Sequence, residues 1–312
     1  MIMYYFIVNP NSRSGAGLDI WNRLRSILES RGISYTGYLT RYIGHAITLS
    51  RQISSSGSPD NPVRLITVGG DGTIHEVLTG ITDFDNVIFG YIPTGSGNDF
   101  CRGMGLPRDP YDALNSILKE ERILSMDVPV YTSGDSTCRF GISTGTGYDA
   151  AVCQEVLVAP AKRFFNRLHL GKLVYLAVAL RQLVYRSPVT VTVEIDDQPP
   201  RTFSRAYFGA VMNLPYEGGG FRFCPKARPD DGLLDVIVIR NIPKLLLLFC
   251  LPTAFFGGHT RIPGVHIFQG RSIHIKTASP QPIHKDGESG GIRSEFSVTL
   301  EKKPLKIIMP VV

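Results

Sequence analysis

The chain has 312 residues, of which 43% are hydrophobic, and its 33 Lys and Arg outnumber its 27 Asp and Glu to give a net charge of +6. This length and composition exclude a disordered or low-complexity chain and favour about two globular domains. The mild positive charge suits anionic lipid surfaces, nucleotides or nucleic acid without choosing among them.

The first 125 residues alternate strand-like and helix-like segments. Strands are predicted over 3–10, 34–40, 63–68 and 86–93, and helices over 18–32, 43–54, 73–79 and 110–118. Strands separated by helices of this length predict a parallel α/β sheet.

The pattern changes after Val128 to short segments in which apolar and polar residues alternate, which is typical of antiparallel strands with one wet face. The segments lie at 128–132, 138–144, 189–196, 205–213, 233–240 and 272–278. One helix is expected from Lys162 to Arg186. We therefore predict an α/β domain over 1–127 and a mostly antiparallel β-sandwich domain over 128–302. A last strand, 303–312, is compatible with a return to the first domain.

Cysteine and histidine usage offers no sign of a disulfide framework or a zinc motif. The five cysteines form no CxxC pair, and the seven histidines form no HExxH motif, so neither a thiolate site nor a catalytic zinc is expected. A reducing, cytoplasmic environment is expected. The start, MIMYYFIVNP, has no basic leader, and the apolar run 245–256 is shorter than the roughly 20 residues of a spanning helix.

The stretch TVGGDGTIHE, residues 67–76, places three glycines and an aspartate at the end of a strand. Glycine lets backbone N–H groups approach a ligand, and the helix that follows favours an anion at its N-terminus. Asp71 would repel a phosphate unless a cation lay between them, so phosphate with Mg²⁺ accounts for the pattern. The alternative is a tight strand–helix turn with Asp71 as a cap.

Two further glycine-bearing loops follow strands: NPNSRSGAG at 9–17 and IPTGSGNDFCR at 92–102. In a parallel α/β sheet, loops after strands lie along one edge, where ligands bind. Because the GxxxxGK[ST] and GxGxxG motifs are absent at strand–helix spacing, the nucleotide site is neither a P-loop nor a dinucleotide fingerprint.

NPNSRSG, GGDGTIHEV and PTGSGNDF, followed by GTGYDAAV, PDDGLLDV and KDGE, together resemble the diacylglycerol kinase catalytic-domain family of lipid kinases. That family includes bacterial diacylglycerol kinases and sphingosine kinases, with NAD kinases as distant relatives. The resemblance spans nearly the whole chain in matching order. His75 departs from the asparagine common in bacterial members, resembles the sphingosine kinase loop, and is assigned no role.

The resemblance implies that ATP binds in a cleft between an α/β domain and a β-sandwich domain. It places at the ATP site Asn9, Ser14, Thr40, Gly69, Gly70, Asp71, Gly72, Thr73, Ser96 and Asn98. It implies that Mg²⁺ is held by the Asp231 side chain and the carbonyls of Arg228 and Leu233, with Asp127 linked to the metal through water.

The general base is expected in the KDGE turn, where Asp286 and Glu288 both qualify by residue type. Asp71 is a third candidate, because the corresponding aspartate of sphingosine kinases has been given the role of general base. A positioned carboxylate that takes the proton of a lipid alcohol accelerates the reaction by roughly 10²- to 10⁴-fold. Without a role in catalysis, the turn would be ordinary Asp-Gly hairpin chemistry, and PDDGLLD would likewise be a plain hairpin turn.

The sequence thus predicts an ATP-dependent lipid kinase that phosphorylates a hydroxyl of diacylglycerol or a related lipid. The alternatives are a non-catalytic nucleotide- or lipid-sensing protein of the same fold and an NAD kinase-like enzyme. The segments 161–186 and 244–259 are candidates for peripheral contact with an anionic membrane, through Lys162, Arg163 and Arg167 in the first, unless both are core helices. No nucleic-acid partner is expected, and a homodimer is left open.

Overall fold

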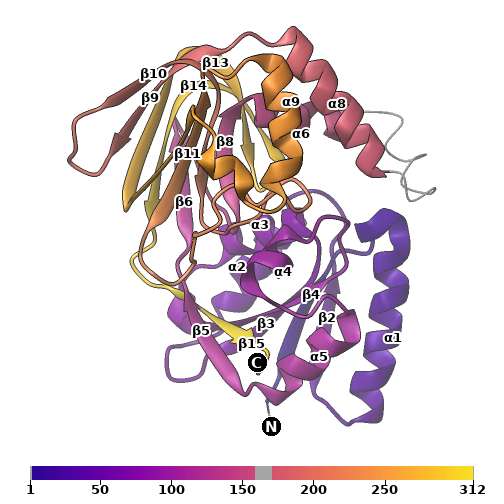
Figure 1. The fold of residues 1–312 in the computed structure, drawn as a ribbon. Coiled ribbons are helices and arrows are strands. Elements are labelled where there is room, and N and C mark those ends of the chain that lie inside the picture. The colour runs from indigo at the N-terminus through magenta and orange to yellow at the C-terminus, as the bar shows by residue number, and fades with distance from the viewer. Residues whose placement is uncertain (1, 159–170, 312) are drawn as a thin grey trace. The chain divides into compact units, whose positions relative to one another are not determined.

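A computed structural model describes residues 2–158 and 171–311. The chain divides into two compact units, residues 1–128 with 301–312 and residues 129–300. Both ends of the chain belong to the first unit, because the last strand returns to it (Figure 1).

The first unit contains a six-stranded sheet in the order β2-β1-β3-β4-β15-β5. The strands are β1 Tyr4–Val8, β2 Tyr35–Leu39, β3 Val63–Gly69, β4 Val87–Pro93, β5 Arg122–Met126 and β15 Leu305–Met309. The first five strands of that order pair in parallel, which confirms the predicted α/β sheet. The edge strand β5 instead pairs antiparallel with β15.

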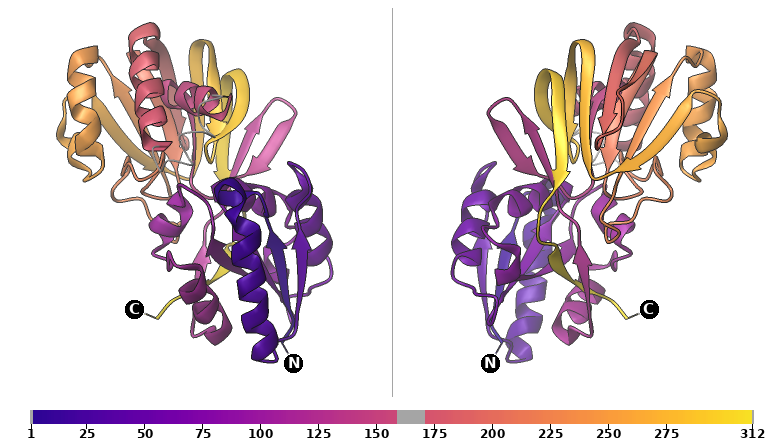
Figure 2. Two further views of the ribbon diagram at one scale, coloured as in Figure 1. Left: turned by 90° about the vertical axis from the view of Figure 1, so that its right-hand side faces the viewer. Right: turned by 90° about the vertical axis from the view of Figure 1, so that its left-hand side faces the viewer.

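Helices cover both faces of this sheet (Figure 2). They are η1 Ser12–Gly15, α1 Ala16–Ser30, α2 His45–Ser54, α3 Asp71–Gly80, η2 Phe84–Asn86, α4 Asp99–Met104 and α5 Pro110–Lys119. In α1 the buried residues Trp21, Leu24 and Leu28 recur at helical spacing and pack on Phe6 and Ile66 of the sheet. The short helix α4 was not predicted, and it lies directly after the PTGSGN loop.

The second unit is built on a nine-stranded antiparallel sheet, as predicted, in the order β12-β11-β10-β8-β13-β14-β6-β7, with β9 paired to both β10 and β13. The strands are β6 Pro129–Ser133, β7 Ser136–Arg139, β8 Ser143–Gly147, β9 Val189–Ile195, β10 Arg201–Met212, β11 Leu234–Arg240, β12 Val265–Gly270, β13 Ser272–Lys285 and β14 Glu288–Leu300. Because β8 and β9 each pair with β10 and with β13, the sheet curls around its own apolar core.

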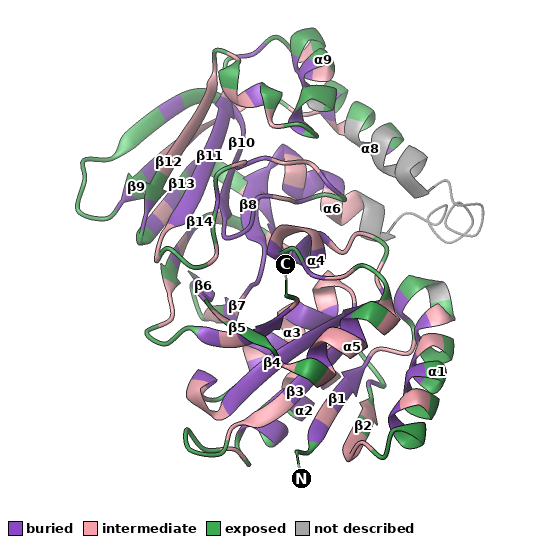
Figure 3. Cartoon of the chain, turned by 60° about the horizontal axis from the view of Figure 1, so that its bottom comes forward, coloured by how far each residue is buried: buried purple, intermediate pink, exposed green. Residues whose placement is uncertain are grey.

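A second core lies between the sheet and three helices, α6 Tyr148–Val158, α8 Gly171–Tyr185 and α9 Lys244–Ala254, followed by η3 Gly258–Arg261. Figure 3 shows β1, β3, β4, β8, β10 and β11 mostly buried, whereas β5 carries exposed residues. Helix α6 was not predicted; it begins where β8 ends. The predicted helix 162–186 is described from Gly171 onward, so Lys162, Arg163 and Arg167 lie outside the described residues. None of the helices within the described residues has the length and apolar character needed to cross a bilayer.

Candidate functional site

In the first unit, the loops after β1, β3 and β4 meet at the carboxyl edge of the sheet. The Asn9 amide donates to the Thr73 hydroxyl at 3.1 Å, which joins the first loop to helix α3. The hydroxyls of Ser12 and Thr94 lie 2.7 Å apart, which joins the first loop to the one after β4. The structure therefore brings together the three loops that the sequence placed at one edge. Ser12 was not among the predicted site residues; its signal was its place in the NPNSRSG loop.

The second and third loops pack backbone against backbone through Gly70 and Gly95. A Cβ on Gly95 would lie 2.7 Å from the Gly70 Cα, and one on Gly70 would lie 3.1 Å from the Gly95 Cα. Side chains at these positions would force the loops apart. The buried Tyr91 hydroxyl donates to the Gly69 carbonyl at 3.0 Å. Burial, followed by the charge of Asp71, raises the pKa of Tyr91 well above its ordinary value, so the hydroxyl keeps its proton.

Asp71 opens helix α3, and its carboxylate accepts the backbone N–H groups of Asp99 and Phe100 at 3.2 Å each. These N–H groups begin helix α4 and have no partner within it, so Asp71 caps a helix other than its own. Gly97 lies beside it, since a Cβ there would be 3.2 Å from an Asp71 oxygen. Asp71 can therefore act as a helix cap and also belong to the loop site. From the loop after β3, its carboxylate holds the loop after β4 in place.

The other predicted nucleotide residues lie around the same edge. Thr40 is buried just after β2, and its N–H donates to the Val8 carbonyl at 2.8 Å. Ser14 lies in η1, and Ser96 is exposed in the third loop. Asn98 takes a left-handed conformation with φ of 51° and donates from its amide to the Gly95 carbonyl at 3.0 Å. Asp127, which follows β5 in this unit, is half-buried.

In the second unit, KDGE forms the two-residue turn between β13 and β14. Lys285 pairs with Glu288, and Asp286 and Gly287 have φ of 50° and 82°, the positive values that a type I′ hairpin turn requires. The buried Asp286 carboxylate accepts the backbone N–H groups of residues 141, 142 and 143 at 2.9, 2.7 and 3.1 Å. Asp286 thereby anchors the turn to the start of β8. Glu288, two residues further, is exposed.

The PDDGLLD loop lies before β11 in the second unit. One oxygen of the exposed Asp231 accepts the Leu233 N–H at 3.0 Å. The Arg228 guanidinium turns toward Asp230, with Nε 3.1 Å from its Oδ1. The donors that the resemblance implies, one carboxylate and two backbone carbonyls, are all oxygen, which suits Mg²⁺. The loop residues therefore fit the ion that the resemblance implies.

A buried cluster of three side chains that the sequence did not reveal lies in the same unit. The Nε2 atom of His284 is 3.0 Å from Asp149 Oδ2 and 3.0 Å from Glu217 Oε1. Burial alone would lower the pKa of His284, but the charges and hydrogen bonds of Glu217 and Asp149 raise it well above its ordinary value. Burial raises the pKa of Asp149. Asp149 belongs to the GTGYDAAV motif, whereas Glu217 and His284 carried no motif signal.

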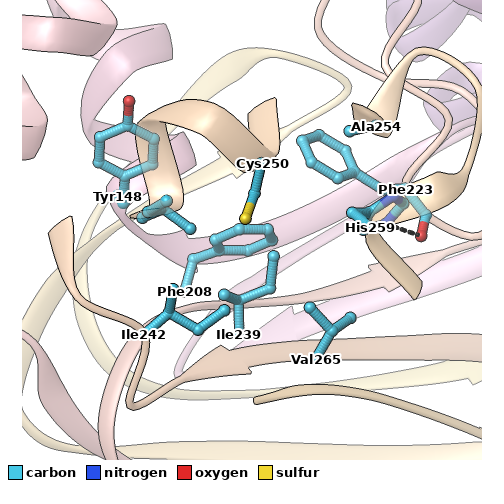
Figure 4. A pocket seen from close by; sticks show the side chains of 10 residues that line it. Tyr148, Phe208, Phe223, Ile239, Ile242, Cys250, Ala254, His259 and Val265 are labelled. Carbon is cyan, nitrogen blue, oxygen red and sulfur yellow. Dashed lines mark hydrogen bonds between the residues drawn. The ribbon is translucent and has the colours of Figure 1, made fainter. Parts of the chain in front are cut away.

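An apolar cavity of about 20 Å³ lies between helix α9 and the sheet (Figure 4). Phe208 of β10 and Ile239 of β11 line it from the sheet, Phe223 lines it from the connection between these strands, and Cys250 lines it from α9. The buried His259 also lines the cavity and hydrogen-bonds to the Phe223 carbonyl at 3.0 Å. Tyr148 lines the cavity too and directly precedes Asp149, so the cavity and the buried cluster share the first turn of α6.

Residues 3–129 match the diacylglycerol kinase catalytic domain, and residues 143–308 match the YegS C-terminal NAD kinase beta sandwich-like domain. A Bacillus subtilis (strain 168) protein named "Putative lipid kinase YtlR" is 32% identical over 98% of this chain and 99% of its own length. A diacylglycerol kinase of Staphylococcus saprophyticus is 28% identical over 91% of this chain and 88% of its own. A crystal structure described as "a putative diacylglycerol kinase" from Bacillus anthracis str. Sterne superposes with a TM-score of 0.76 at 22% identity, covering 99% of this chain and 95% of that one.

The two matches fall on the α/β unit and, for the most part, on the antiparallel unit, and together with the relatives they define a phosphotransferase. The chain belongs to the family of lipid kinases that carry a diacylglycerol kinase catalytic domain followed by a YegS-type C-terminal domain. The predicted family, fold class and kinase activity are thereby confirmed.

Proposed function

We propose that this lipid kinase transfers the γ-phosphate of ATP, with Mg²⁺, to a hydroxyl of diacylglycerol or a related lipid, and that Glu288 is the general base. The observation that carries the base assignment is the hydrogen bonding of Asp286. Both oxygens of its buried carboxylate are bound to backbone N–H groups of residues 141–143. A base has to reach the substrate hydroxyl, and the exposed carboxylate of the turn is that of Glu288. Asp286 is then a positioning residue.

The nucleotide is proposed to lie along the carboxyl edge of the first unit's sheet. Gly70 and Gly95 pack directly on each other and carry no side chain that would cover their own backbone N–H groups, which suits the close approach of phosphate oxygens. Asp231, with the carbonyls of Arg228 and Leu233, would hold Mg²⁺, which supplies charge neutralisation of phosphate oxygens.

The acyl part of the substrate is proposed to enter the apolar cavity beneath α9. Its lining is aromatic and aliphatic, as an acyl chain requires. The cavity is narrow, so α9 has to move outward to admit a chain. Replacing Cys250 by Leu would fill part of the cavity. We expect the KM for a long-chain diacylglycerol to rise by roughly tenfold, with a smaller change for a dioctanoyl substrate; equal effects on both substrates would contradict this placement.

The outer face of α9 is proposed to contact the membrane. Leu245 and Phe249 of α9, and Phe256 in the turn after the helix, are 69%, 68% and 87% exposed, whereas Leu247 and Cys250 of α9 are buried. Such an exposed apolar set beside a lipid cavity is typical of an interfacial surface. Lys244, which donates from Nζ to the Val184 carbonyl of α8 at 2.7 Å, would lie near the headgroups.

Vesicle co-sedimentation tests this surface. A Phe249→Ser, Phe256→Ser double variant should lose most binding to vesicles containing anionic lipid, while Ile123→Ser, an exposed apolar residue of β5, should bind like the wild type. Equal binding to neutral and anionic vesicles would show that attraction to anionic lipid does not contribute to membrane binding. Unchanged binding of the double variant would show that these exposed apolar residues do not contact the membrane.

The reaction itself is tested with radiolabelled ATP against diacylglycerol, sphingosine, phosphatidylglycerol and undecaprenol in mixed micelles, with thin-layer separation of products. We expect phosphorylation of diacylglycerol, and a Glu288→Gln variant should bind ATP but form little product. If the enzyme prefers another lipid alcohol, the proposed substrate is wrong, but the assignment of Glu288 as the base is unaffected. Full activity of Glu288→Gln would overturn the base assignment.

A further inference from the structure

Asp149, Glu217 and His284 come from three separate segments of the second unit: the first turn of α6, the connection from β10 to β11, and the end of β13. One ligand atom from each lies within 4.8 Å of the other two. Their side chains are 9%, 7% and 0% exposed. The cluster is therefore a converged polar site inside the unit, separate in residues from the KDGE turn and from the PDDGLLD loop.

The carboxylates of this cluster are poorly satisfied. Asp149 Oδ1 and Glu217 Oε2 are buried and have no hydrogen-bond partner among the described residues. In the described part of the chain, neither carboxylate forms an ion pair with a lysine or an arginine. Arg186 lies close enough to Asp149 to feel its charge, but its guanidinium donates to Gln182 and Gln281. Among the described residues, the two buried carboxylates thus share one imidazole as their ion-pair partner.

Gly145 of β8 makes room for the converged atoms. A Cβ at this position would lie 2.5 Å from Asp149 Oδ2 and 2.7 Å from His284 Nε2, so any larger residue would push these two atoms away. The backbone of β8 therefore forms a wall against which the cluster is held.

We propose that Asp149, Glu217 and His284 bind a divalent transition-metal ion of the zinc type, through one oxygen of each carboxylate and His284 Nε2. Zinc bonds of about 2.0–2.1 Å place tetrahedral ligand atoms roughly 3.3–3.4 Å apart. The two 3.0 Å separations around Nε2 need only a small expansion to reach that spacing. Imidazole with carboxylates suits zinc, whereas Mg²⁺ and Ca²⁺ favour oxygen ligands alone. No short-range motif reveals the site, because its ligands are spread from residue 149 to residue 284.

The ion would fix the base of the β13–β14 hairpin. His284 is two residues before Asp286 and pairs with Ser289 across the hairpin, so a metal bond at Nε2 ties the KDGE turn to α6 and to the loop carrying Glu217. This role concerns the rigidity of the second unit. It holds whichever lipid the enzyme phosphorylates and whichever carboxylate is the base.

Metal analysis of the full chain tests the proposal. The protein is stripped with a chelator, incubated with Zn²⁺, desalted and measured by plasma mass spectrometry. We expect one zinc per chain for the wild type and less than about a tenth of that for Glu217→Gln and for Asp149→Asn, which keep the shape of the side chains. Asp231→Asn, in the oxygen-only loop, should keep its zinc. Replacement by Co²⁺ should give the visible absorption of a four-coordinate site.

Thermal unfolding supplies a readout that does not depend on activity. At a zinc concentration ~100-fold above Kd, the Tm of the wild type should rise by about 5 °C or more, and that of Glu217→Gln should not change. Circular dichroism confirms that each variant is folded before it is compared. A wild type that holds no zinc, or variants that hold as much as the wild type, would overturn the proposal. A third outcome would also overturn it: neither the wild type nor Glu217→Gln holds metal, and the variant differs only in a higher KM for lipid. The cluster would then recognise a polar group of the substrate.

Discussion

The contrast between Asp286 and Glu288 gives the sharpest test of how the KDGE turn works. Asp286→Asn keeps the side-chain shape but replaces one acceptor oxygen by an NH₂ group, which cannot accept the buried N–H of Gly141 or those of residues 142 and 143. Hydrogen bonds to charged groups contribute about 1.5–3 kcal/mol each. We expect the free energy of unfolding to fall by about 2 kcal/mol, or roughly 4–8 °C in Tm for a unit of this size.

Glu288→Gln changes an exposed side chain, so stability should stay within about 0.5 kcal/mol of the wild type. The turnover of the same variant should fall by roughly 10²- to 10⁴-fold, because the base is lost while ATP binding is retained. Glu194→Gln, also exposed on a strand of this unit, is the matched control. Calorimetry and a mixed-micelle kinase assay measure both quantities. The reasoning is refuted if Asp286→Asn is as stable as the wild type yet inactive, since Asp286 would then be the base.

Three further outcomes are expected in the first unit. Gly95→Ala should weaken nucleotide binding by about tenfold in titration calorimetry, because its Cβ would meet Gly70 Cα at 2.7 Å. Gly57→Ala is the control: its Cβ would meet the Asn86 carbonyl at 2.5 Å, so it should lower stability and leave nucleotide affinity unchanged. Asp71→Asn should lower turnover by roughly 100-fold and loosen α4; near-normal activity would limit Asp71 to capping. Burial raises the pKa of Cys101 to about 11 from an ordinary 9.0, so the native state keeps a proton that the unfolded chain releases. Urea unfolding should therefore show stability falling between about pH 9 and 11, less steeply in Cys101→Ala; identical slopes would contradict this.

Strands and helices were predictable where apolar residues recur at the regular spacing of the element, because that spacing shows which face is buried. The alternation in 189–196 and the helical spacing of Trp21, Leu24 and Leu28 are local signals, and they correspond to β9 and α1. Helix α6 had no such signal. The apolar residues of the sequence YDAAVCQEVLV do not recur at one helical spacing, and the helix contacts both the sheet and α8. The antiparallel pairing of β5 was also hidden, because it depends on β15, which lies about 180 residues further along the chain.

The functional site likewise has features that the sequence predicts and features that depend on tertiary pairing. The glycine loops follow strands directly, so parallel topology alone predicts that they share an edge. Glu217 and His284 lie about 67 residues apart, and their contact depends on how β10 and β13 pair on either side of β8. No sequence period encodes that pairing. The distinction between Asp286 and Glu288 was also open, since both are acidic residues of one turn and only the burial of one carboxylate against β8 separates them.

Asp71 and Asp286 use the same physical device in two different units. Each carboxylate accepts backbone N–H groups that begin another element: α4 for Asp71 and β8 for Asp286. Glycine-bearing loops lose much conformational entropy when they are ordered, and hydrogen bonds to a charged acceptor are strong enough to offset part of that loss. Since these aspartates order the loops, the residues that contact substrate can be others, such as the exposed Glu288. Substitution of either aspartate should therefore lower activity together with local order, whereas substitution of Glu288 should lower activity alone.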